Sequence, residues 1–466
     1  WLFITYLVLA FLFYFLSGYQ LHFRQSKGNL SMPSASSGTV ELVEGASVTQ
    51  DFVVVIQRLQ NVSVQWGTYN RPNSGSVLMQ LYNLKDNSLL MSQSFDAATI
   101  SEGSITSMAA EKPIETVYGV PLRLIITSNS LPGSAASPMM SATAQGGNSF
   151  ILTLNNAPVE GTLCFVATGE DYIWTGLHYW KLVSGMGVVF ALYLYSVYRK
   201  WTYGKNSLLV NAVFAMSKYR FLIKQLVARD FKSKYKRSVL GVFWSFLNPL
   251  LTMIVQYLVF SNLFRFDVPY YPVYLLCGII LFNFFSEACG MTLASIVGNA
   301  SLITKVYVPK YVYPMTRVLS SFINFLIALV PLFAVALFSG LHPTKAWLLL
   351  PFVLICLAVF TLGLGMLLAT AMTFFRDTQF LWGVLSMIWM YLTPIFYPAS
   401  ILPENIVWVL KCNPLYYFVT FTRILIIDGV SPEPVMYFTC ASFSLCMLGL
   451  GAALFKKHQD NFVLYL

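Results

Sequence analysis

Charged side chains are scarce in this sequence of 466 residues: they make up 10% of it, whereas hydrophobic residues make up 57%. An ordinary soluble protein is about 25% charged. Uncharged apolar runs recur that are long enough to cross the roughly 30 Å hydrocarbon layer of a bilayer. The composition therefore excludes a disordered chain, a collagen and a small disulfide scaffold. It predicts a polytopic α-helical membrane protein.

Motifs for metal or redox chemistry are also missing from the sequence. Its seven cysteines are scattered without a CxxC pair, and only Cys164 lies within residues 21–178. That segment therefore cannot form a disulfide of its own. The four histidines are far apart in sequence, at His22, His178, His342 and His458. We expect no metal site, no bound cofactor and no catalytic residues in this chain.

The charge balance differs between two parts of the chain. Residues 21–178 carry seven Lys/Arg and eleven Asp/Glu, whereas the remainder carries twenty-two basic and eight acidic residues. A basic excess can indicate a nucleic-acid partner. In a membrane protein it indicates instead that positive side chains are retained on the cytoplasmic side. We therefore expect no nucleic-acid partner.

The first 200 residues predict two membrane helices that flank an external domain. Residues 1–18 form an uncharged run that fits a retained helix better than a cleaved signal peptide. From about residue 21 to 178, short alternating or β-branched runs such as 77–82 and 122–126 are separated by turn formers such as 71–75. About eight such strands predict an inserted all-β, jelly-roll-like antiparallel sandwich.

Eight membrane spans are expected in all. After the span at 179–198, six more apolar segments follow, at 239–264, 273–297, 318–341, 346–375, 378–403 and 435–455. The predicted organisation is a first helix (1–20), the β domain (21–178), a second helix (179–200), a cytoplasmic linker with an interface helix (201–238), a six-span core (239–455) and a cytoplasmic tail (456–466).

The basic residues between spans predict the orientation. With the N-terminus inside, the inner segments (199–237, 298–317, Arg376 and the Lys456–Lys457 pair) hold seventeen basic residues, against five in the short outer segments. Inner loops of membrane proteins are enriched in Lys and Arg. We therefore expect both termini in the cytoplasm, the β domain outside, and the chain in the cytoplasmic membrane.

Two inner segments carry unusual patterns. Residues 219–237 place an apolar stripe beside a cluster of lysines and arginines, which predicts an amphipathic helix in the membrane interface. Residues 299–310, followed by Pro314, combine a polar start, a short apolar stretch, two lysines and restrictive prolines. A short rigid element there could be pushed by a motor subunit. A simple membrane anchor and an ordinary turn are the alternative interpretations of these segments.

The order of several short motifs resembles one family, the membrane (permease) subunit of ABC-2-type exporters of lipid-linked polysaccharides such as O-antigen, capsule and teichoic acid. The resemblance covers about 219–466, and the N-terminal two-span unit is an addition to it. The motifs that follow the interface helix are GVFWSFLNPL, NASLITKVYVPKYVYP, FFRD, YLTPIFYP, NPL and the terminal FKKHQDNFVLYL.

The resemblance implies a homodimer that works with two copies of a cytosolic ATPase. The sequence has no GxxxxGK[ST] phosphate loop, so ATP and Mg²⁺ would bind to that partner. The implied ATPase-docking residues are Ser301, Leu302, Ile303, Lys305, Val306, Tyr307, Pro309, Lys224, Arg229 and Asp230. Cations near the inner headgroups and the substrate diphosphate would be Lys232, Lys234, Lys236 and Arg237.

A prenyl-diphosphate-linked polysaccharide needs aromatic faces for its sugars as well as cations for its diphosphate. Aromatic residues also serve as ordinary packing, so these assignments are hypotheses. Candidates for the glycan path are Phe282, Phe285, Trp389, Tyr391, Tyr397 and Glu287. Glu287 is the one acid deep within a span, and either acts in transport or is a hydrogen-bonded packing residue. An external sugar face could comprise Trp66, Tyr69, Arg71, Asn73 and Tyr82.

Two other classes of protein remain as alternatives. An external β domain between two spans is also typical of a membrane sensor or receptor, although no cytosolic kinase or coiled coil follows here. A membrane glycosyltransferase or acyltransferase would need clustered catalytic side chains, which the short inner loops lack. The preferred interpretation is a transport subunit that is not itself an enzyme.

Overall fold

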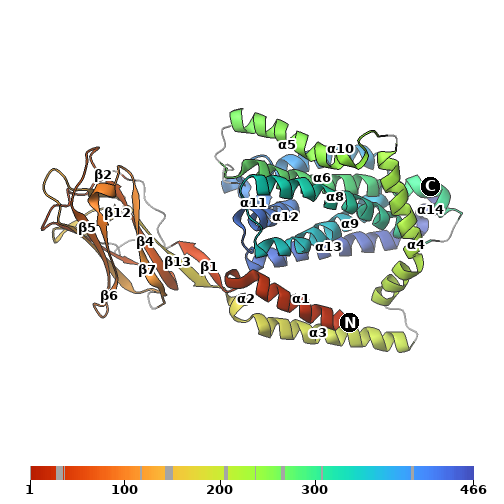
Figure 1. Ribbon diagram of the computed structural model, residues 1–466. Helices are drawn as coiled ribbons and strands as arrows, with labels where there is room; N and C mark the ends of the chain where they lie inside the picture. Colours follow the sequence, from red (N-terminus) through yellow and green to blue (C-terminus); the bar gives the residue numbers. More distant parts are fainter. Residues whose placement is uncertain are drawn as a thin grey trace. The chain divides into compact units, whose positions relative to one another are not determined.

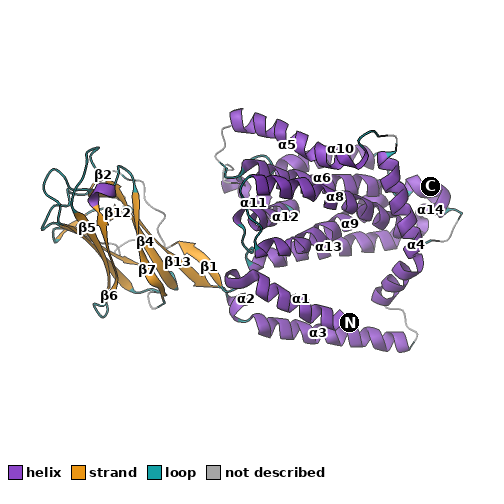
Figure 2. Cartoon of the chain, viewed as in Figure 1, coloured by secondary structure: helices purple, strands orange, loops and turns teal. Residues whose placement is uncertain are grey.

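The computed structural model describes residues 2–27, 35, 37–115, 118–141, 151–203, 208–236, 238–263, 268–305, 308–399 and 404–465. The chain divides into two compact units. The membrane unit comprises Trp1–Leu21 and Tyr179–Leu466, and the β unit comprises His22–His178. Figure 2 shows that strands are confined to the β unit and that the long helices belong to the membrane unit.

The β unit is built from two sheets of antiparallel strand pairs. The seven-stranded sheet has the order β1-β13-β4-β9-β12, with β2 on β9 and β7 on β4, and the six-stranded sheet has the order β11-β10-β3-β8-β5-β6. The strands are β1 (Phe23–Lys27), β2 (Ser37–Gly38), β3 (Ser47–Val53), β4 (Arg58–Gly67), β5 (Ser76–Asn83), β6 (Leu89–Asp96), β7 (Ile105–Ile114), β8 (Pro121–Ser128), β9 (Ser137–Ser141), β10 (Ile151–Leu154), β11 (Ala157–Val159), β12 (Thr162–Leu163) and β13 (Phe165–Tyr172).

The core of the β unit lies between these sheets. Alternate residues of β3 and β8 are buried, as expected for strands with one face inward. The rings of Phe52 on β3 and Phe165 on β13 meet at 4.7 Å between centroids, so the two sheets face each other. The predicted β-sandwich is confirmed.

The turn that follows β4 is held by hydrogen bonds to a carboxylate. The carboxylate of Glu102 accepts hydrogen bonds from the backbone N–H (2.6 Å) and hydroxyl (3.0 Å) of Thr68 and from the N–H of Asn70 (3.5 Å). Tyr69 and Asn70 adopt left-handed backbone angles, with φ of 56° and 54°. These hydrogen bonds hold the pKa of Glu102 below its usual value. Glu102 thus ties the turn at 68–70 to the loop before β7.

We predict that acid loosens this turn. Because the folded pKa of Glu102 is lowered, its stabilising contribution is present above the usual Glu pKa of about 4.3 and is lost as pH falls through the folded value. Hydrogen exchange of the amides of Thr68 and Asn70 should accelerate as pH is lowered from about 5 to 3, after correction for intrinsic rates. Glu102→Gln should lose this dependence, whereas Glu160→Gln on the exposed surface should keep it. An unchanged profile in Glu102→Gln would contradict the assignment.

Among the residues that the structure describes, seven helices of the membrane unit are long and apolar enough to cross a membrane. They are α1 (Leu2–Ser17), α3 (Tyr179–Thr202), α5 (Trp244–Leu263), α6 (Tyr271–Leu293), α8 (Val312–Phe338), α9 (Leu350–Phe374) and α13 (Pro434–His458). The shorter or interfacial helices are α2 (Trp174–Leu177), α4 (Leu208–Tyr235), α7 (Ala300–Ile303), α10 (Thr378–Leu392), α11 (Glu404–Cys412), α12 (Pro414–Arg423) and α14 (Phe462–Tyr465). Figure 1 shows α4 and α14 at the same end of the bundle, called the α4 end below.

The eighth expected span, 378–403, is wrong as a continuous helix. α10 ends at Leu392 after 15 residues, because the prolines at 394 and 398 cannot continue it. The carbonyls that are freed find donors from other helices. The guanidinium of Arg423 donates to the carbonyls of Pro394 (2.7 Å) and Ile395 (3.0 Å). The hydroxyls of Tyr271 and Tyr274 donate to the next carbonyls, of Phe396 (2.6 Å) and Tyr397 (2.9 Å).

Candidate functional site

The interface helix α4 begins at Leu208, eleven residues before the predicted start at Tyr219. Its Leu226 is buried in an apolar cluster with Tyr313 of α8 and Phe462 of α14. One helical turn further along the same face comes Asp230, which is only 8% exposed. The face of α4 that packs on the bundle therefore includes a carboxylate within its apolar stripe.

Two arginines neutralise Asp230. Arg317 of α8 lies 2.8 Å from one carboxylate oxygen, and Arg229 lies 3.1 Å from the other. Arg229 also donates to the side-chain oxygen of Asn299 at 3.3 Å, and Asn299 donates in turn to the carbonyl of Ser295. A buried carboxylate is stable only when its partners are in place. This cluster fixes α4 to α8 and to the first residue of the 299–310 element.

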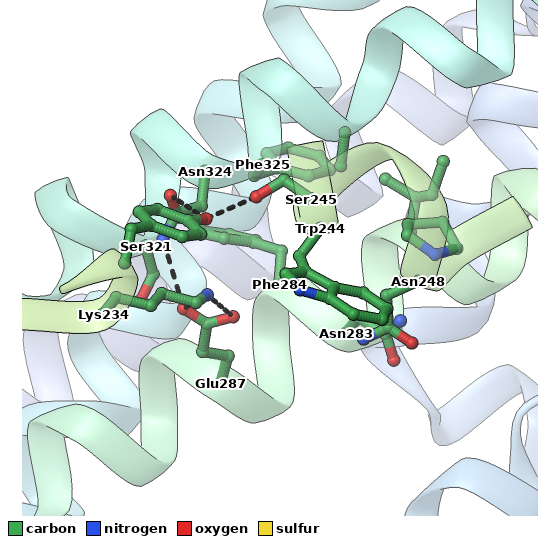
Figure 3. Close-up of a pocket in the computed structure, with 14 residues that line it drawn as sticks. Lys234, Trp244, Ser245, Asn248, Asn283, Phe284, Glu287, Ser321, Asn324 and Phe325 are labelled. Carbon is green, nitrogen blue, oxygen red and sulfur yellow. Dashed lines mark hydrogen bonds and ion pairs between the residues drawn. The ribbon is translucent and has the colours of Figure 1, made fainter. Parts of the chain in front are cut away.

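A second polar cluster lies one turn further along α4 (Figure 3). The ammonium of Lys234 lies 2.8 Å from both carboxylate oxygens of Glu287 on α6. The amide of Asn324 on α8 donates to Glu287 at 3.5 Å, and its oxygen accepts from the hydroxyl of Tyr235 at 3.1 Å. Tyr235 also contacts the hydroxyl of Ser245 at the start of α5. Four helices thus contribute to one hydrogen-bonded group.

These side chains line a cavity of about 490 Å³, called the Glu287 cavity. Two neighbouring cavities, of about 710 and 620 Å³, also include Glu287 in their walls. The Glu287 cavity presents hydroxyls and amides together with two aromatic rings (Figure 3), one of them exposed and the other 4% exposed and stacked on Phe325. These side chains are Ser245, Asn248, Asn283, Ser321 and Asn324, with the rings of Trp244 and Phe284. Such a lining can hydrogen-bond sugar hydroxyls and stack on sugar rings.

Glu287 lies closer to the α4 end than its position in the sequence indicated. α6 ends at Leu293, so Glu287 is only about 9 Å from that end along the helix axis. The side chains of Lys234 and Glu287 are 39% and 36% exposed. The ion pair is therefore within reach of water and of a ligand that enters from this end.

The 299–310 element packs on the bundle through one side and leaves the other exposed. Leu302, Ile303 and Val308 pack against the apolar cluster that holds Leu226 and Phe462. Ser301 and Lys305 are exposed, and Pro309 is half-buried. The predicted docking residues Val306 and Tyr307 lie outside the described residues, as does the predicted headgroup cation Arg237.

The docking and headgroup residues on α4 have different surroundings. Asp230 is buried, so its carboxylate does not belong to an exposed docking surface. The guanidinium of Arg229 already donates hydrogen bonds to Asp230 and Asn299. Lys224, Lys232 and Lys236 are exposed, whereas Lys234 pairs with Glu287.

The aromatic candidates for the glycan path are mostly core residues. Phe282 and Phe285 are 6% and 0% exposed. Phe285 packs on Trp389 with 5.2 Å between ring centroids, and the indole N–H of Trp389 donates to Asn413. Tyr391 is 60% exposed, and its carbonyl accepts from the hydroxyl of Tyr397. Phe282 and Glu287 line the cavity of about 620 Å³, Trp389 and Tyr397 are half-buried, and Tyr391 lies on the surface.

The candidate external sugar face does not form one surface. Trp66 is fully buried between the sheets, with its indole N–H bonded to Thr106, because its position on β4 faces inward. Tyr82 lies six residues along β5 from Ser76, about 20 Å from the start of that strand. Asn73 is buried. Tyr69 is 55% exposed, and the guanidinium of Arg71 stacks on its ring while pairing with Glu41.

Several residues of these clusters were not predicted from the sequence. Asn248, Asn283 and Asn324 are uncharged residues within apolar runs, so charge patterning does not reveal them. Arg317 and Arg423 were counted only as loop charges. A signal was available in each case, because a polar residue inside a membrane span usually has a partner.

Comparison with known proteins was decisive for the family. Residues 221–427 match the family model described as ABC-2 type transporter. The chain is 30% identical over 243 residues to the O-antigen export system permease protein RfbA of Klebsiella pneumoniae, an alignment that covers 52% of this chain and 93% of that relative. The chain belongs to the ABC-2 type transporter family. With seven apolar helices, it is a multi-pass membrane protein.

Alignments with two other relatives cover a similar share of this chain. RfbA of Myxococcus xanthus is 29% identical over 256 residues, which cover 54% of this chain and 98% of that protein. The polysialic acid transport protein KpsM of Escherichia coli is 22% identical over 241 residues, which cover 51% of this chain and 93% of KpsM. The ABC-2 match at 221–427 contains Asp230, Lys234, Glu287, Asn324 and Arg423. The β unit lies outside it.

Proposed function

We propose that this chain is the permease subunit of an ABC exporter that moves a lipid-linked polysaccharide outward across the bacterial cytoplasmic membrane. The observation that carries the proposal is the similarity to nearly the whole length, 93%, of an O-antigen export permease. The Glu287 cavity supports it with hydrogen-bonding and aromatic groups suited to sugars. Lys234, which is paired with Glu287, could exchange that carboxylate for the diphosphate of a substrate headgroup.

The proposal includes a partner that hydrolyses ATP. The sequence has no phosphate-binding loop of its own. We assign two copies of a cytosolic ATPase, which would bind ATP and Mg²⁺, to a homodimer of this chain. The α4 end would face the cytoplasm, and the β unit would lie outside. The exposed residues Ser301 and Lys305 would contact the ATPase.

A displacement of the 299–310 element has a physical route to the Glu287 cavity. Asn299 bonds to Arg229, Arg229 pairs with Asp230, and Lys234 lies one turn further along the same helix. α4 is continuous between these residues, so it can move as a rigid rod. The nucleotide cycle of the partner could in this way alter the ion pair at Glu287.

Neither alternative function is retained. A sensor hypothesis rests on the external β unit alone, whereas the family match covers most of the membrane unit. A transferase would need paired catalytic groups, and the polar clusters described above are ion pairs and amides without a general base beside a nucleophile.

Deletion and complementation test the proposal. A strain of the source bacterium that lacks this chain should accumulate lipid-linked polysaccharide inside the cell and lose the polymer from its surface. The tagged wild-type chain should restore the surface polymer and copurify with a protein that contains a phosphate-binding loop. Normal surface polysaccharide in the deletion strain, without a paralogous exporter, would contradict the proposal.

We predict that exchanging the charges of Lys234 and Glu287 separates structure from transport. Glu287→Lys alone places two cations together and should cost about 1 kcal/mol of stability at this part-exposed site. The exchanged pair, Lys234→Glu with Glu287→Lys, should regain the melting temperature but keep export at least about tenfold below wild type. Lys457→Glu, at an exposed lysine outside the proposed site, is the control. If the exchange restores export fully, the ion pair only stabilises the structure and has no role in transport.

A further inference from the structure

A groove between α4 and α8 is separate from the Glu287 cavity. Its volume is about 610 Å³. Its floor is apolar and comes from both helices: Ile223, Val227 and Phe231 on α4, and Leu319, Phe322 and Ile323 on α8. None of the residues that line the groove belongs to the Asp230 cluster or to the Lys234 cluster.

Three cations border this apolar floor. Arg220, Lys224 and Lys232 line the groove, and all three are exposed. Among the described residues that line it, none is acidic. The one acid of the helix segment, Asp230, is buried and already paired with two arginines. The groove therefore combines an uncompensated positive rim with an apolar floor.

The apolar surface continues from the groove along α8. Exposed side chains recur at helical spacing after Leu319, and they share one face of the helix. They are Ile323, Leu326, Val330 and Leu337, which are 40–52% exposed. An acyl chain that starts beside the cations can therefore follow α8 into the hydrocarbon layer.

We infer that this groove binds an anionic phospholipid of the inner leaflet. The phosphate lies against Arg220, Lys224 and Lys232, and one acyl chain occupies the apolar floor between α4 and α8. The charge complementarity selects an anionic headgroup, because each cation near such a surface contributes to binding. The bound lipid holds α4 against α8, alongside the Asp230 cluster. This site does not depend on the identity of the transported polymer.

Native mass spectrometry of the detergent-purified full-length chain tests the site. The probes are phosphatidylglycerol and phosphatidylcholine with the same acyl chains. The wild type should retain phosphatidylglycerol about tenfold more tightly than phosphatidylcholine, and the triple variant Arg220→Gln/Lys224→Gln/Lys232→Gln should lose this preference. The matched control is Lys218→Gln/Lys456→Gln/Lys457→Gln, which removes three exposed cations that do not line the groove, and it should keep the preference.

A second variant fills the floor without changing charge. Val227→Trp should weaken phosphatidylglycerol binding while the rim remains intact, and lipid-free melting temperatures confirm that each variant is folded. Equal retention of the two lipids by the wild type, or an equal loss in the control triple, would overturn the inference. So would displacement of phosphatidylglycerol by an equimolar prenyl diphosphate, which assigns the groove to the substrate path. A change in the monomer–dimer ratio of lipid-free Val227→Trp would assign it to a contact between two copies.

Discussion

Replacing Arg423 by Ala is expected to lower the free energy of unfolding of the membrane unit by about 3–5 kcal/mol. Arg423 is 7% exposed, and its guanidinium donates to three backbone carbonyls and stacks on Tyr274 at 3.3 Å. Two of these carbonyls belong to the broken segment after α10, which has no helical donors of its own. Loss of the Arg423 side chain leaves these buried carbonyls unpaired, and each unpaired carbonyl costs about 1–3 kcal/mol.

Thermal unfolding of the purified chain measures this effect. Arg423→Lys should restore only part of the stability, since an ammonium has three donors and lacks the planar geometry that serves carbonyls on two sides. Arg376→Ala, on an exposed turn, should leave the melting temperature unchanged. A melting temperature of Arg423→Ala equal to that of Arg376→Ala would show that the carbonyls find other donors.

Replacing Asp230 by Ala should have a comparable effect and should also reduce export. The change leaves the guanidinium of Arg317, which is 21% exposed, without its carboxylate, and should cost about 3 kcal/mol. Because Arg229 would lose the group that orients it toward Asn299, α4 would lose its polar contact with the 299–310 element and keep only the apolar one. Export should fall at least about tenfold, even at a temperature where the variant is folded.

A double-mutant cycle separates the ion pair from general damage. Asp230→Ala combined with Arg317→Ala should be less destabilised than the sum of the single changes, by about 1–3 kcal/mol. Asp377→Ala, on the exposed turn before α10, serves as the control for loss of a carboxylate. Additive effects of the two changes would show that Asp230 and Arg317 act independently.

The fold was largely predictable because its signals are local. Long apolar runs predicted the seven described helices that could span a membrane, and two-residue alternation predicted the sandwich. The span at 378–403 failed because hydropathy does not register that Pro394 ends α10. The structure tolerates this break because Arg423, 29 residues away from Pro394, and the hydroxyls of Tyr271 and Tyr274 supply the missing donors. Such a long-range partner is not visible in a local window.

The candidate site was predicted in parts but not as an assembly. Lys234 and Glu287 were each singled out, but their pairing joins positions 53 residues apart. Asp230 was assigned to an exposed docking surface from the family resemblance alone, which does not show that its carboxylate is buried and paired. Trp66 was assigned to a sugar face because strand periodicity separates two faces without showing which one is inward. Burial and pairing in each case depend on which elements meet in space.

We propose above that this chain forms the conduit and depends on another chain for energy. The most direct test of this proposal is reconstitution of the full-length chain, with and without the copurifying ATPase, in vesicles supplied with lipid-linked polysaccharide. We expect ATP-dependent appearance of polymer on the opposite side only when both chains are present, and no nucleotide hydrolysis by this chain alone. Hydrolysis or export by the isolated chain would contradict it.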